Sequence, residues 1–524
     1  MSDHTPKQAL ETTAENAPHS EKKYSRRQLL TKVGIAGAAA LYGSALTSVA
    51  GSKSVYGHPL DLSEMDLCIA TTISELRAME EPEADCLYFV TDPGQEGPFK
   101  YDAADLTSAD NTGLVLVSSS GARFKRVLQT EHLNVKWFGA KGDGVQDDSA
   151  AIKLAIETAV SLNTGAHAGY LGVNASLFFP RGVYRVTANN LFSNIQYTGS
   201  IKRGVTFCGE HMCSSLLYLE TNNTEKWFYN NGSGNAKLER VLFQDLGFTS
   251  DSDMYGNGFK IWSNGGEKQF KFFRCAFGST VNASMQDTSG GLNNAFYFWG
   301  TGNADLMKFH SCLFDCQGNI FTLNNPQSVV IETVATDITT SKDVIYVEDG
   351  GGGCVNLFGG SCVVFTKTGD SAPGRYIVNV SEEAAIGPGN NNFNFFGVRF
   401  ELQGANRGIV NSPYTGGELA VLFDGCNFGT VNGPEREAVQ LGPSKSVAFR
   451  NCTLNEKLKF VLHGSHNSSN SAPNGGHLIF DNCQTGLSTS PLFQRILFTG
   501  NIGRAVARNC RMRGGVSFIN KKVV

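Results

Sequence analysis

Four acidic residues stand where a pair of carboxyl groups can do acid–base chemistry. Glu348 and Asp349 end one short apolar run, and Glu382 and Glu383 end the next. If the two runs are neighbouring parallel strands, carboxyl groups come within about 5 Å of each other, or about 10 Å across two strand spacings. The shorter separation suits a retaining glycosidase and the longer an inverting one. We therefore take these acids as catalytic candidates, with solvated strand-end acids as the alternative interpretation.

The same short runs carry aromatic and polar residues on one face. If their β-branched and aliphatic residues point inward, alternation sends the remaining side chains outward. The candidates for substrate binding are Lys260, Trp262, Tyr297, Trp299, Asn324, Tyr346 and, adjoining the same runs, Arg375. Sugar rings stack their C–H faces on aromatic rings while their hydroxyls bond to polar groups. The face is therefore expected to bind a glycan, and the alternative is a secondary core covered by long loops.

Three functions are compatible with these residues. Hydrolysis of a polysaccharide would use two of the four acids, whereas β-elimination would use Lys260, Arg375, Tyr346 or a calcium ion to neutralise a uronate. The outward face holds one lysine and no arginine cluster, which favours hydrolysis slightly. A non-catalytic glycan-binding or adhesin protein is the third hypothesis. No cofactor is expected, with calcium reserved for the lyase alternative.

A repeated unit positions these runs. Beyond residue 190, anchor residues recur at 243, 272, 309, 331, 358, 396, 423, 449, 480 and 507, spaced by 22 to 38 residues as in a solenoid. Phe423 and Cys426 can both face the core only if the two residues between them turn a corner. Gly425 and the equivalent Asn451 tolerate the left-handed backbone that such a corner requires. The repeated cysteines then stack as buried apolar fillers.

Opening strands are expected ahead of the anchors, at 258–262, 295–299, 320–324, 344–348, 376–380, 408–411, 438–441 and 460–463. The longest insertions, 278–294, 366–374 and 381–392, adjoin these strands. Loops on one face of a solenoid usually wall its binding surface, so a cleft is expected from Lys260 to about Asn411.

A glycine-rich segment stands before the repeats. Gly139, Gly142 and Gly144 precede Asp147, Asp148 and Ser149, which predicts a strand over 135–138, a turn and a capped helix start. The helix has one apolar stripe, which consists of Ile152, Ala155, Ile156, Ala159 and Val160. Lys153, Glu157 and Thr158 are left on the outside. A phosphate loop is disfavoured because the Walker spacing and its lysine are missing.

Residues 138–152 and 177–186 together resemble the opening of the pectate-lyase-like superfamily, which includes polysaccharide lyases, glycoside hydrolases and phage tailspikes. The resemblance implies an all-β fold, a right-handed parallel β-helix solenoid of about ten or more coils with an N-terminal capping α-helix and a small N-terminal β module. It implies a polysaccharide substrate and leaves the reaction open, because the motif builds the cap and first coil. The paired-aspartate and Gly-His-Gly motifs of polygalacturonases are absent. A homotrimer is compatible with the resemblance but unsupported by the residues.

The N-terminal region has the layout of a twin-arginine export signal. Arg26 and Arg27 precede the weakly apolar run 33–49, which is short for a membrane span of about 20 residues. We predict a signal peptide at 1–50, a linker and small β module at 51–133, and a β-helix domain at 134–524. Residues 66–133 show alternation typical of short antiparallel strands. The mature protein is expected in the periplasm or outside the cell, without stable membrane insertion.

Composition excludes other classes. The net charge is −4, and no basic tract follows the signal, so nucleic acid is not an expected partner. Thirteen cysteines cannot all pair, and cargo of this export route folds in the reducing cytoplasm. Cys312-x3-Cys316 and Cys208-x4-Cys213 lack a second pair or a histidine at ligand spacing. The cysteines are therefore predicted to be core thiols and not metal ligands.

Overall fold

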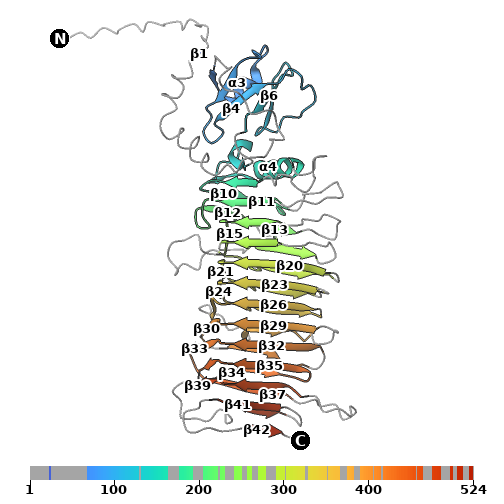
Figure 1. The fold of residues 1–524 in the computed structure, drawn as a ribbon, viewed down its shortest axis with the longest axis vertical. Coiled ribbons are helices and arrows are strands. Elements are labelled where there is room, and N and C mark those ends of the chain that lie inside the picture. The colour runs from blue at the N-terminus through green and yellow to red at the C-terminus, as the bar shows by residue number, and fades with distance from the viewer. Residues whose placement is uncertain are drawn as a thin grey trace, which may run out of the picture. The chain divides into compact units, whose positions relative to one another are not determined.

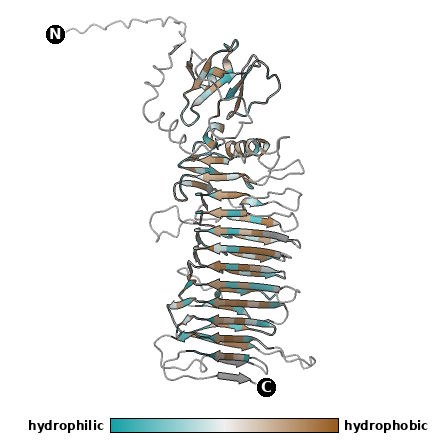
Figure 2. Ribbon diagram, viewed as in Figure 1, coloured by the Kyte–Doolittle hydropathy of each residue, from teal (hydrophilic) through white to brown (hydrophobic). Residues whose placement is uncertain are grey.

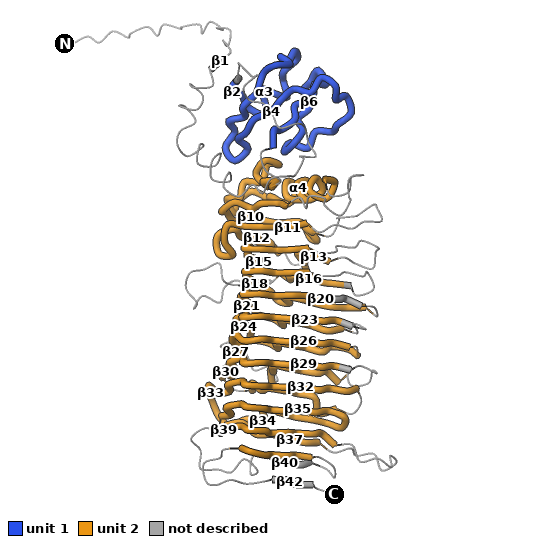
Figure 3. Tube along the Cα trace, in the orientation of Figure 1, with its two compact units in different colours: residues 1–129 blue, residues 130–524 orange. Residues whose placement is uncertain are grey.

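The computed structural model divides into two compact units, residues 1–129 and 130–524 (Figure 3). It describes residues 23–24 and 68–522 apart from 129–131, 163–175, 193–204, 222–224, 231–240, 251–255, 263–269, 279–290, 301–302, 325–327, 351, 366–373, 383–389, 405, 415–416, 456, 464–474, 486–495, 500–503 and 511–518. Among the described residues, no helix is long and apolar enough to span a bilayer.

The first unit is one sheet with a short helix. Its strands β1 (Lys23–Tyr24), β2 (Cys68–Thr71), β3 (Leu87–Val90), β4 (Gly97–Tyr101), β5 (Val115–Val117) and β6 (Arg123–Arg126) are ordered β1-β2-β3-β4-β6-β5. The prediction of antiparallel strands alone is wrong at Ile73–Ala78, which forms helix α3 because Thr72 and Glu75 make a capping box. Helix α3 connects β2 to β3 as a crossover, which lets the two strands pair in parallel.

The second unit contains three long sheets, each built from strands of successive coils (Figure 1). The opening sheet consists of β13 (Trp227–Asn230), β16 (Asn257–Trp262), β19 (Phe296–Trp299), β22 (Phe321–Asn324), β25 (Ile345–Asp349), β28 (Arg375–Val380), β31 (Arg407–Ser412), β34 (Arg436–Leu441), β37 (Leu458–His463) and β40 (Ile496–Thr499). Eight of these ten strands coincide, within one or two residues at their ends, with the predicted opening strands.

The anchor sheet consists of β7 (His132–Asn134), β9 (Ser176–Phe179), β11 (Thr206–Gly209), β14 (Leu242–Gln244), β17 (Phe270–Phe273), β20 (Asn303–His310), β23 (Ser328–Val334), β26 (Gly353–Phe358), β29 (Asn390–Phe396), β32 (Glu418–Asp424), β35 (Lys445–Arg450), β38 (His477–Asp481), β41 (Arg504–Arg508) and β42 (Ile519–Lys522).

The third sheet follows the anchor in each coil and consists of β8 (Asp143–Asp147), β10 (Gly182–Val186), β12 (Ser215–Leu219), β15 (Gly247–Ser250), β18 (Ala276–Gly278), β21 (Leu313–Cys316), β24 (Asp337–Thr340), β27 (Ser361–Phe365), β30 (Arg399–Gln403), β33 (Asn427–Val431), β36 (Thr453–Leu454) and β39 (Gln484–Thr485). Described strands of this unit pair in parallel except β41 with β42. The predicted right-handed parallel β-helix is confirmed.

The glycine-rich segment folds differently from the prediction. Val135–Phe138 forms the 3-10 helix η1 and not a strand. The chain after the first glycines forms β8. Asp148 accepts hydrogen bonds from the backbone N–H groups of Lys141 and Gly142 at 2.6 and 3.0 Å. The Asp148 carboxylate therefore holds the glycine turn, whereas Asp147 Oδ1 accepts from the Ser149 N–H at 3.0 Å at the start of the helix, as predicted.

Helix α4 (Ser149–Leu162) follows with its predicted apolar stripe buried, and it contacts β7 and β9 beside the first coil (Figure 1). Thr158, predicted to face outward, is 7% exposed. Its hydroxyl donates to the backbone oxygen of Leu154 at 2.8 Å, which allows a polar residue to lie on the covered side.

Among the described residues, the ten anchor strands from β14 to β41 each end in a corner with left-handed backbone. The predicted Gly425 and Asn451 have φ of 65° and 52°. Three predicted anchors are out of register, because Thr333, Leu357 and Phe395 align with the core row in place of residues 331, 358 and 396. Phe358 lies outside instead and is 40% exposed. Gly359 and Gly397, with φ of 66° and 64°, place the left-handed corner residue one position earlier than the aromatic pattern indicates.

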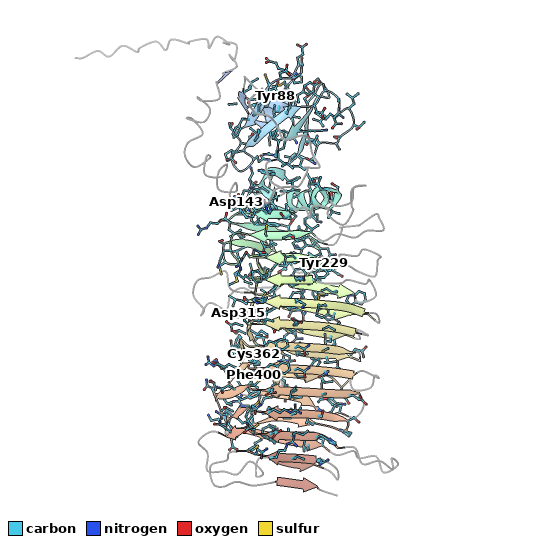
Figure 4. All side chains as sticks on the ribbon, viewed as in Figure 1. Tyr88, Asp143, Tyr229, Asp315, Cys362 and Phe400 are labelled. Atoms are coloured by element: carbon cyan, nitrogen blue, oxygen red, sulfur yellow. The ribbon has the colours of Figure 1, made fainter. Side chains whose placement is uncertain are left out.

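The core of this unit is a stack of aromatic rings and thiols. Phe243, Phe272 and Phe309 stack at 5.0 Å from coil to coil. The predicted core thiols Cys426, Cys452, Cys483 and Cys510 are at most 5% exposed. Cys362 and Phe400 are neighbours in register on β27 and β30 (Figure 4). Hydrophobic and hydrophilic residues both colour the anchor strands in Figure 2, as expected for strands with one buried face.

Candidate active site on the opening sheet

The outer face of the opening sheet carries one polar and aromatic row in register. Lys260 pairs with Tyr297, Tyr297 with Thr322, Thr322 with Tyr346 and Tyr346 with Asn379. Most of these side chains are half-buried, and Thr322 is only 1% exposed. The expected exposed aromatic ladder is therefore partly covered by its own neighbours.

A β-bulge interrupts the adjacent row at Glu348. Val347 pairs with Leu323, but Asn324 pairs with Asp349, so Glu348 is an extra residue on β25. A bulge leaves one residue outside the regular ladder and re-aims its side chain, and bulges are common beside active sites. Here the bulge turns Glu348 back toward the preceding coils.

Glu348 is the centre of a cluster built from consecutive coils. Its Oε2 accepts hydrogen bonds from the Tyr297 hydroxyl at 2.5 Å and from Asn324 Nδ2 at 2.7 Å. Asn324 Nδ2 also donates to the Tyr297 oxygen at 2.8 Å. The Ser381 hydroxyl donates to the Glu348 backbone oxygen at 2.5 Å. Burial, and next the Glu348 carboxylate, raise the pKa of Tyr297, so its phenol remains a proton donor at neutral pH.

Three aromatic rings surround the ammonium group of Lys260. Its Nζ lies 5.5, 5.1 and 5.4 Å from the ring centres of Trp227, Tyr297 and Trp299. Such distances are those of cation–π contacts. Trp227 is 3% exposed and was missed by sequence reasoning, although residues 227–230 have the aromatic pattern of the later opening strands. Lys260 and the three rings of Trp227, Tyr297 and Trp299 form a group that we call the lysine box. Tyr297 belongs both to this box and to the Glu348 cluster.

The other predicted acids are not bonded to this cluster among the described contacts. Asp349 Oδ1 accepts from the backbone N–H of Gly350 at 2.6 Å, and Glu382 is exposed just after β28. Glu383 and the side chain of Trp262 lie outside the described residues. Most of the predicted cleft-walling insertions lie there too. Arg375 begins β28, where it pairs in register with Arg407.

Asp343, which the sequence did not single out, is a second notable carboxyl. It is 2% exposed and accepts from the Tyr376 N–H at 2.7 Å and from Asn379 Nδ2 at 2.8 Å. Burial raises its pKa to about 6, against the lowering effect of these donors and of Arg375 and Arg407. Both of its oxygens are occupied by protein, so this carboxyl shapes the sheet and is not a group for substrate chemistry.

Among the residues that the structure describes, no three His, Cys, Asp or Glu side chains converge as metal ligands. A cluster of three acidic ligands for calcium is therefore absent among the described side chains.

Comparison with known proteins gives partial matches of several kinds. Over 105 residues the chain is 35% and 37% identical to two non-secreted LysM effectors of Penicillium expansum, covering 18% of this chain and 7% and 8% of theirs. It is 31% identical over 99 residues to a glucan 1,3-beta-glucosidase of Cochliobolus carbonum, covering 18% of this chain and 11% of that protein. The chain thus spans a small part of these relatives.

Solved structures give longer alignments at low identity. The tailspike gp42 of Acinetobacter phage vb_AbaP_AS12 aligns with 10% identity and a TM-score of 0.45, over 87% of this chain and 76% of that one. WceF of Pantoea stewartii, described as a glycan biofilm modifying enzyme with a tailspike-like parallel β-helix, aligns with 12% identity and a TM-score of 0.37, over 84% and 52%.

Family models cover most of the described chain. Residues 69–129 match the small four-stranded β-sheet domain of phage tail proteins. Residues 132–488, which contain every described residue of the Glu348 cluster and the lysine box, match the rhamnogalacturonase A/epimerase, pectate lyase-like model. The chain belongs to the rhamnogalacturonase A/epimerase, pectate lyase-like family.

Proposed function

We propose that this protein is an exported enzyme that hydrolyses glycosidic bonds of a polysaccharide on the outer face of the opening sheet. The observation that carries the proposal is the Glu348 carboxylate, re-aimed by a bulge and bonded to Tyr297 and Asn324. A carboxyl group held in place by donors from neighbouring elements suits acid–base catalysis. The family's description, which names polysaccharide-cleaving enzymes, supports the same class.

The arrangement assigns different work to the two oxygens of Glu348. Oε2 is occupied by the Tyr297 and Asn324 donors, whereas no described residue bonds Oε1. Oε1 is therefore the oxygen for the substrate or an attacking water. The second carboxyl group of the reaction comes from Asp349, Glu382 or Glu383. Trp299, which is half-buried, offers a stacking surface for a sugar unit.

β-Elimination is the second candidate reaction, favoured by Lys260. Its ammonium lies within 5.1 Å of the Tyr297 ring centre, and the Tyr297 hydroxyl bonds to Glu348. A uronate bound there would have its carboxylate near a cation and its ring near a carboxylate base. This reaction gives an unsaturated sugar, which absorbs in the ultraviolet, whereas hydrolysis gives no unsaturated product. A non-catalytic glycan-binding protein would give neither product.

Replacing Glu348 with Gln tests the proposal. Turnover on a panel of neutral and acidic polysaccharides, measured by reducing ends and by absorbance of unsaturated product, should fall by about 10²-fold or more. The melting temperature should stay near that of the wild type, because Gln keeps the shape and the acceptor oxygen. Glu418→Gln, an exposed change on β32, is the matched control and should retain activity. Full activity of Glu348→Gln would place the chemistry elsewhere.

A further inference from the structure

The geometry points to Tyr297 as the nucleophile of the proposed hydrolysis, with Glu348 as its general base, and to glycans containing 2-ulosonic acids as the substrate class. A 2-ulosonic acid carries a carboxylate on its anomeric carbon. The inference rests on the proposed function, and it replaces a second carboxylate nucleophile with a phenol.

The first step of the argument is the orientation of the phenol. The Tyr297 hydroxyl donates to Glu348 Oε2 at 2.5 Å and accepts from Asn324 Nδ2 at 2.8 Å. A phenolic oxygen has one proton and two lone pairs, so one lone pair is left for an electrophile. A nucleophile within hydrogen-bond reach of a base that a third group orients is the general pattern of covalent catalysis. Tyr297, Glu348 and Asn324 meet that pattern.

The second step concerns where the proton goes. Burial and the Glu348 carboxylate raise the pKa of Tyr297, so the resting phenol is protonated and neutral. It can attack only if the proton leaves as the new bond forms. Glu348 Oε2 is already in contact with that proton, so no rearrangement is needed for the transfer.

The third step is the match of charges. A carboxylate nucleophile approaching an anomeric carbon that bears its own carboxylate meets repulsion between like charges, whereas a neutral phenol does not. Sialidases, which act on such sugars, use a tyrosine nucleophile for a chemically equivalent task. Lys260 supplies the cation beside Tyr297, with its Nζ 5.1 Å from the Tyr297 ring centre. The carboxylate of the substrate would pair with this ammonium.

The reaction balances in two steps. The Tyr297 oxygen forms a bond to the anomeric carbon while the glycosidic C–O bond breaks with its electron pair. Glu348 takes the phenolic proton, and the leaving oxygen takes a proton from the second carboxyl group, Asp349 or Glu382. Water then bonds to the anomeric carbon as the aryl ether breaks, and Glu348 returns its proton to the tyrosine oxygen. The proton that water loses restores the second carboxyl group.

A panel of polysaccharides with and without 2-ulosonic acids, incubated with the full-length protein, tests the substrate class. Cleavage is expected only of chains that contain them, with the released sugar first appearing as the retained anomer by NMR. Cleavage of chains lacking them, or an inverted first product, would overturn the inference. Cleavage of none would overturn the proposed function as well.

Variants test the role of Tyr297. Tyr297→Phe should lower kcat on the cleaved chain by about 10³-fold or more, as removal of a nucleophile does. Tyr218→Phe, on strand β12 of the third sheet, is the matched control and should keep kcat within a few fold. An inactive Glu348→Gln beside an active Tyr297→Phe would overturn the nucleophile assignment while leaving the proposed function standing.

A covalent readout separates catalysis from positioning. The wild type, treated with a 2,3-difluoro analogue of the ulosonic acid that the panel releases, should gain the mass of the sugar on the peptide containing Tyr297. Tyr297→Phe should gain none, and its melting temperature will show whether it is folded. An adduct on a carboxylate, or none on the wild type, would reduce Tyr297 to a residue that positions Glu348.

Discussion

At the scale of single residues, the carboxyl groups of Glu348, on strand β25, and Asp343, just before that strand, have opposite environments. Glu348 is half-buried on the bulge and presents one oxygen that no described residue bonds, whereas Asp343 is 2% exposed with both oxygens bonded. Desolvation favours the neutral acid at Asp343 and donors favour its charged form. The rise of its pKa to about 6 shows that desolvation is the larger effect. Asp343 therefore links the stability of the opening sheet to pH.

Replacing Asp343 with Asn should change how stability depends on pH. An acid whose pKa is raised by folding contributes most below its unfolded value and loses that contribution as pH rises through the folded value. The shift from 3.8 to about 6 corresponds to about 3 kcal/mol at about 1.4 kcal/mol per unit. The melting temperature of the wild type minus that of Asp343→Asn should rise as pH falls from 7 to 4. Parallel curves would contradict the assignment.

At the scale of elements, the corner after the anchor strands from β14 to β41 is the recurring point of strain. Asparagine and glycine fill it in the late coils, but Arg274 and Ala335 adopt φ of 49° and 48° in earlier ones. Arg274 gains compensation, since it bonds to Asp245 of the preceding corner at 2.6 Å and its guanidinium lies 4.6 Å from the Phe273 ring centre. Ala335 has no side-chain polar group with which to gain such contacts. The corner geometry is therefore imposed by the stacked sheets.

Ala335→Gly should stabilise the protein. A left-handed alanine costs about 1 to 2 kcal/mol of stability. Glycine removes this cost but loses about 0.5 to 1 kcal/mol because more conformational entropy is lost when it is ordered. A net gain of about 0.5 to 1 kcal/mol is expected in chemical denaturation. Ala448→Gly, in the interior of β35, is the control and should lose a similar amount. Equal losses in both variants would argue against strain at residue 335.

The thiol stack makes a prediction about reactivity. Cys213 is exposed, whereas Cys426, Cys452, Cys483 and Cys510 are buried. The neighbouring Cys426 thiol, with burial, raises the pKa of Cys452 to about 12, which suppresses its reactive thiolate. In the native protein a thiol reagent should label Cys213 rapidly and these four only after denaturation, as peptide mapping will show. Fast native labelling of any of the four would contradict the buried stack.

At the scale of the whole molecule, the chain combines a small β unit with a β-helix unit, and each has a family model of its own. The twin-arginine layout precedes the residues that the two family models match, and Arg26, Arg27 and the run 33–49 lie outside the described residues. This export route carries proteins that are already folded, which is consistent with a repeat core built on free thiols. Export therefore stays a proposal, argued from the N-terminal residues alone.

Changing Arg26 and Arg27 together to lysine tests export. A twin-arginine signal depends on this pair, so the folded protein should accumulate in the cytoplasm and disappear from the exported fraction. Cell fractionation with glycan-cleavage assays on each fraction measures the result, and Lys22→Arg is a charge-preserving control. Unchanged secretion of the double variant would rule out this route.

Local patterns in the sequence determined the coils, because strand alternation and corner tolerance each involve only a few neighbouring residues. Opening strands such as Ala295 to Trp299 and corners such as Asn451 follow from side-chain periodicity and from asparagine's tolerance of positive φ. The buried position of Cys452 follows from the same argument that the two residues after the anchor must turn a corner. These features depend on short-range sterics and burial, which the order of residues displays directly.

Only the tertiary structure decided the site. Tyr297 and Glu348 are 51 residues apart, and their contact depends on coil lengths that insertions vary and on a bulge that hydrogen bonding between β22 and β25 creates. Trp227 contacts Lys260 although register pairs Trp227 with Asn257 and Lys260 with Asn230. Ala335 turns a corner because its neighbours on the adjacent coils do. Register is a property of strands paired across long separations, so residue types alone do not reveal which groups of different coils meet.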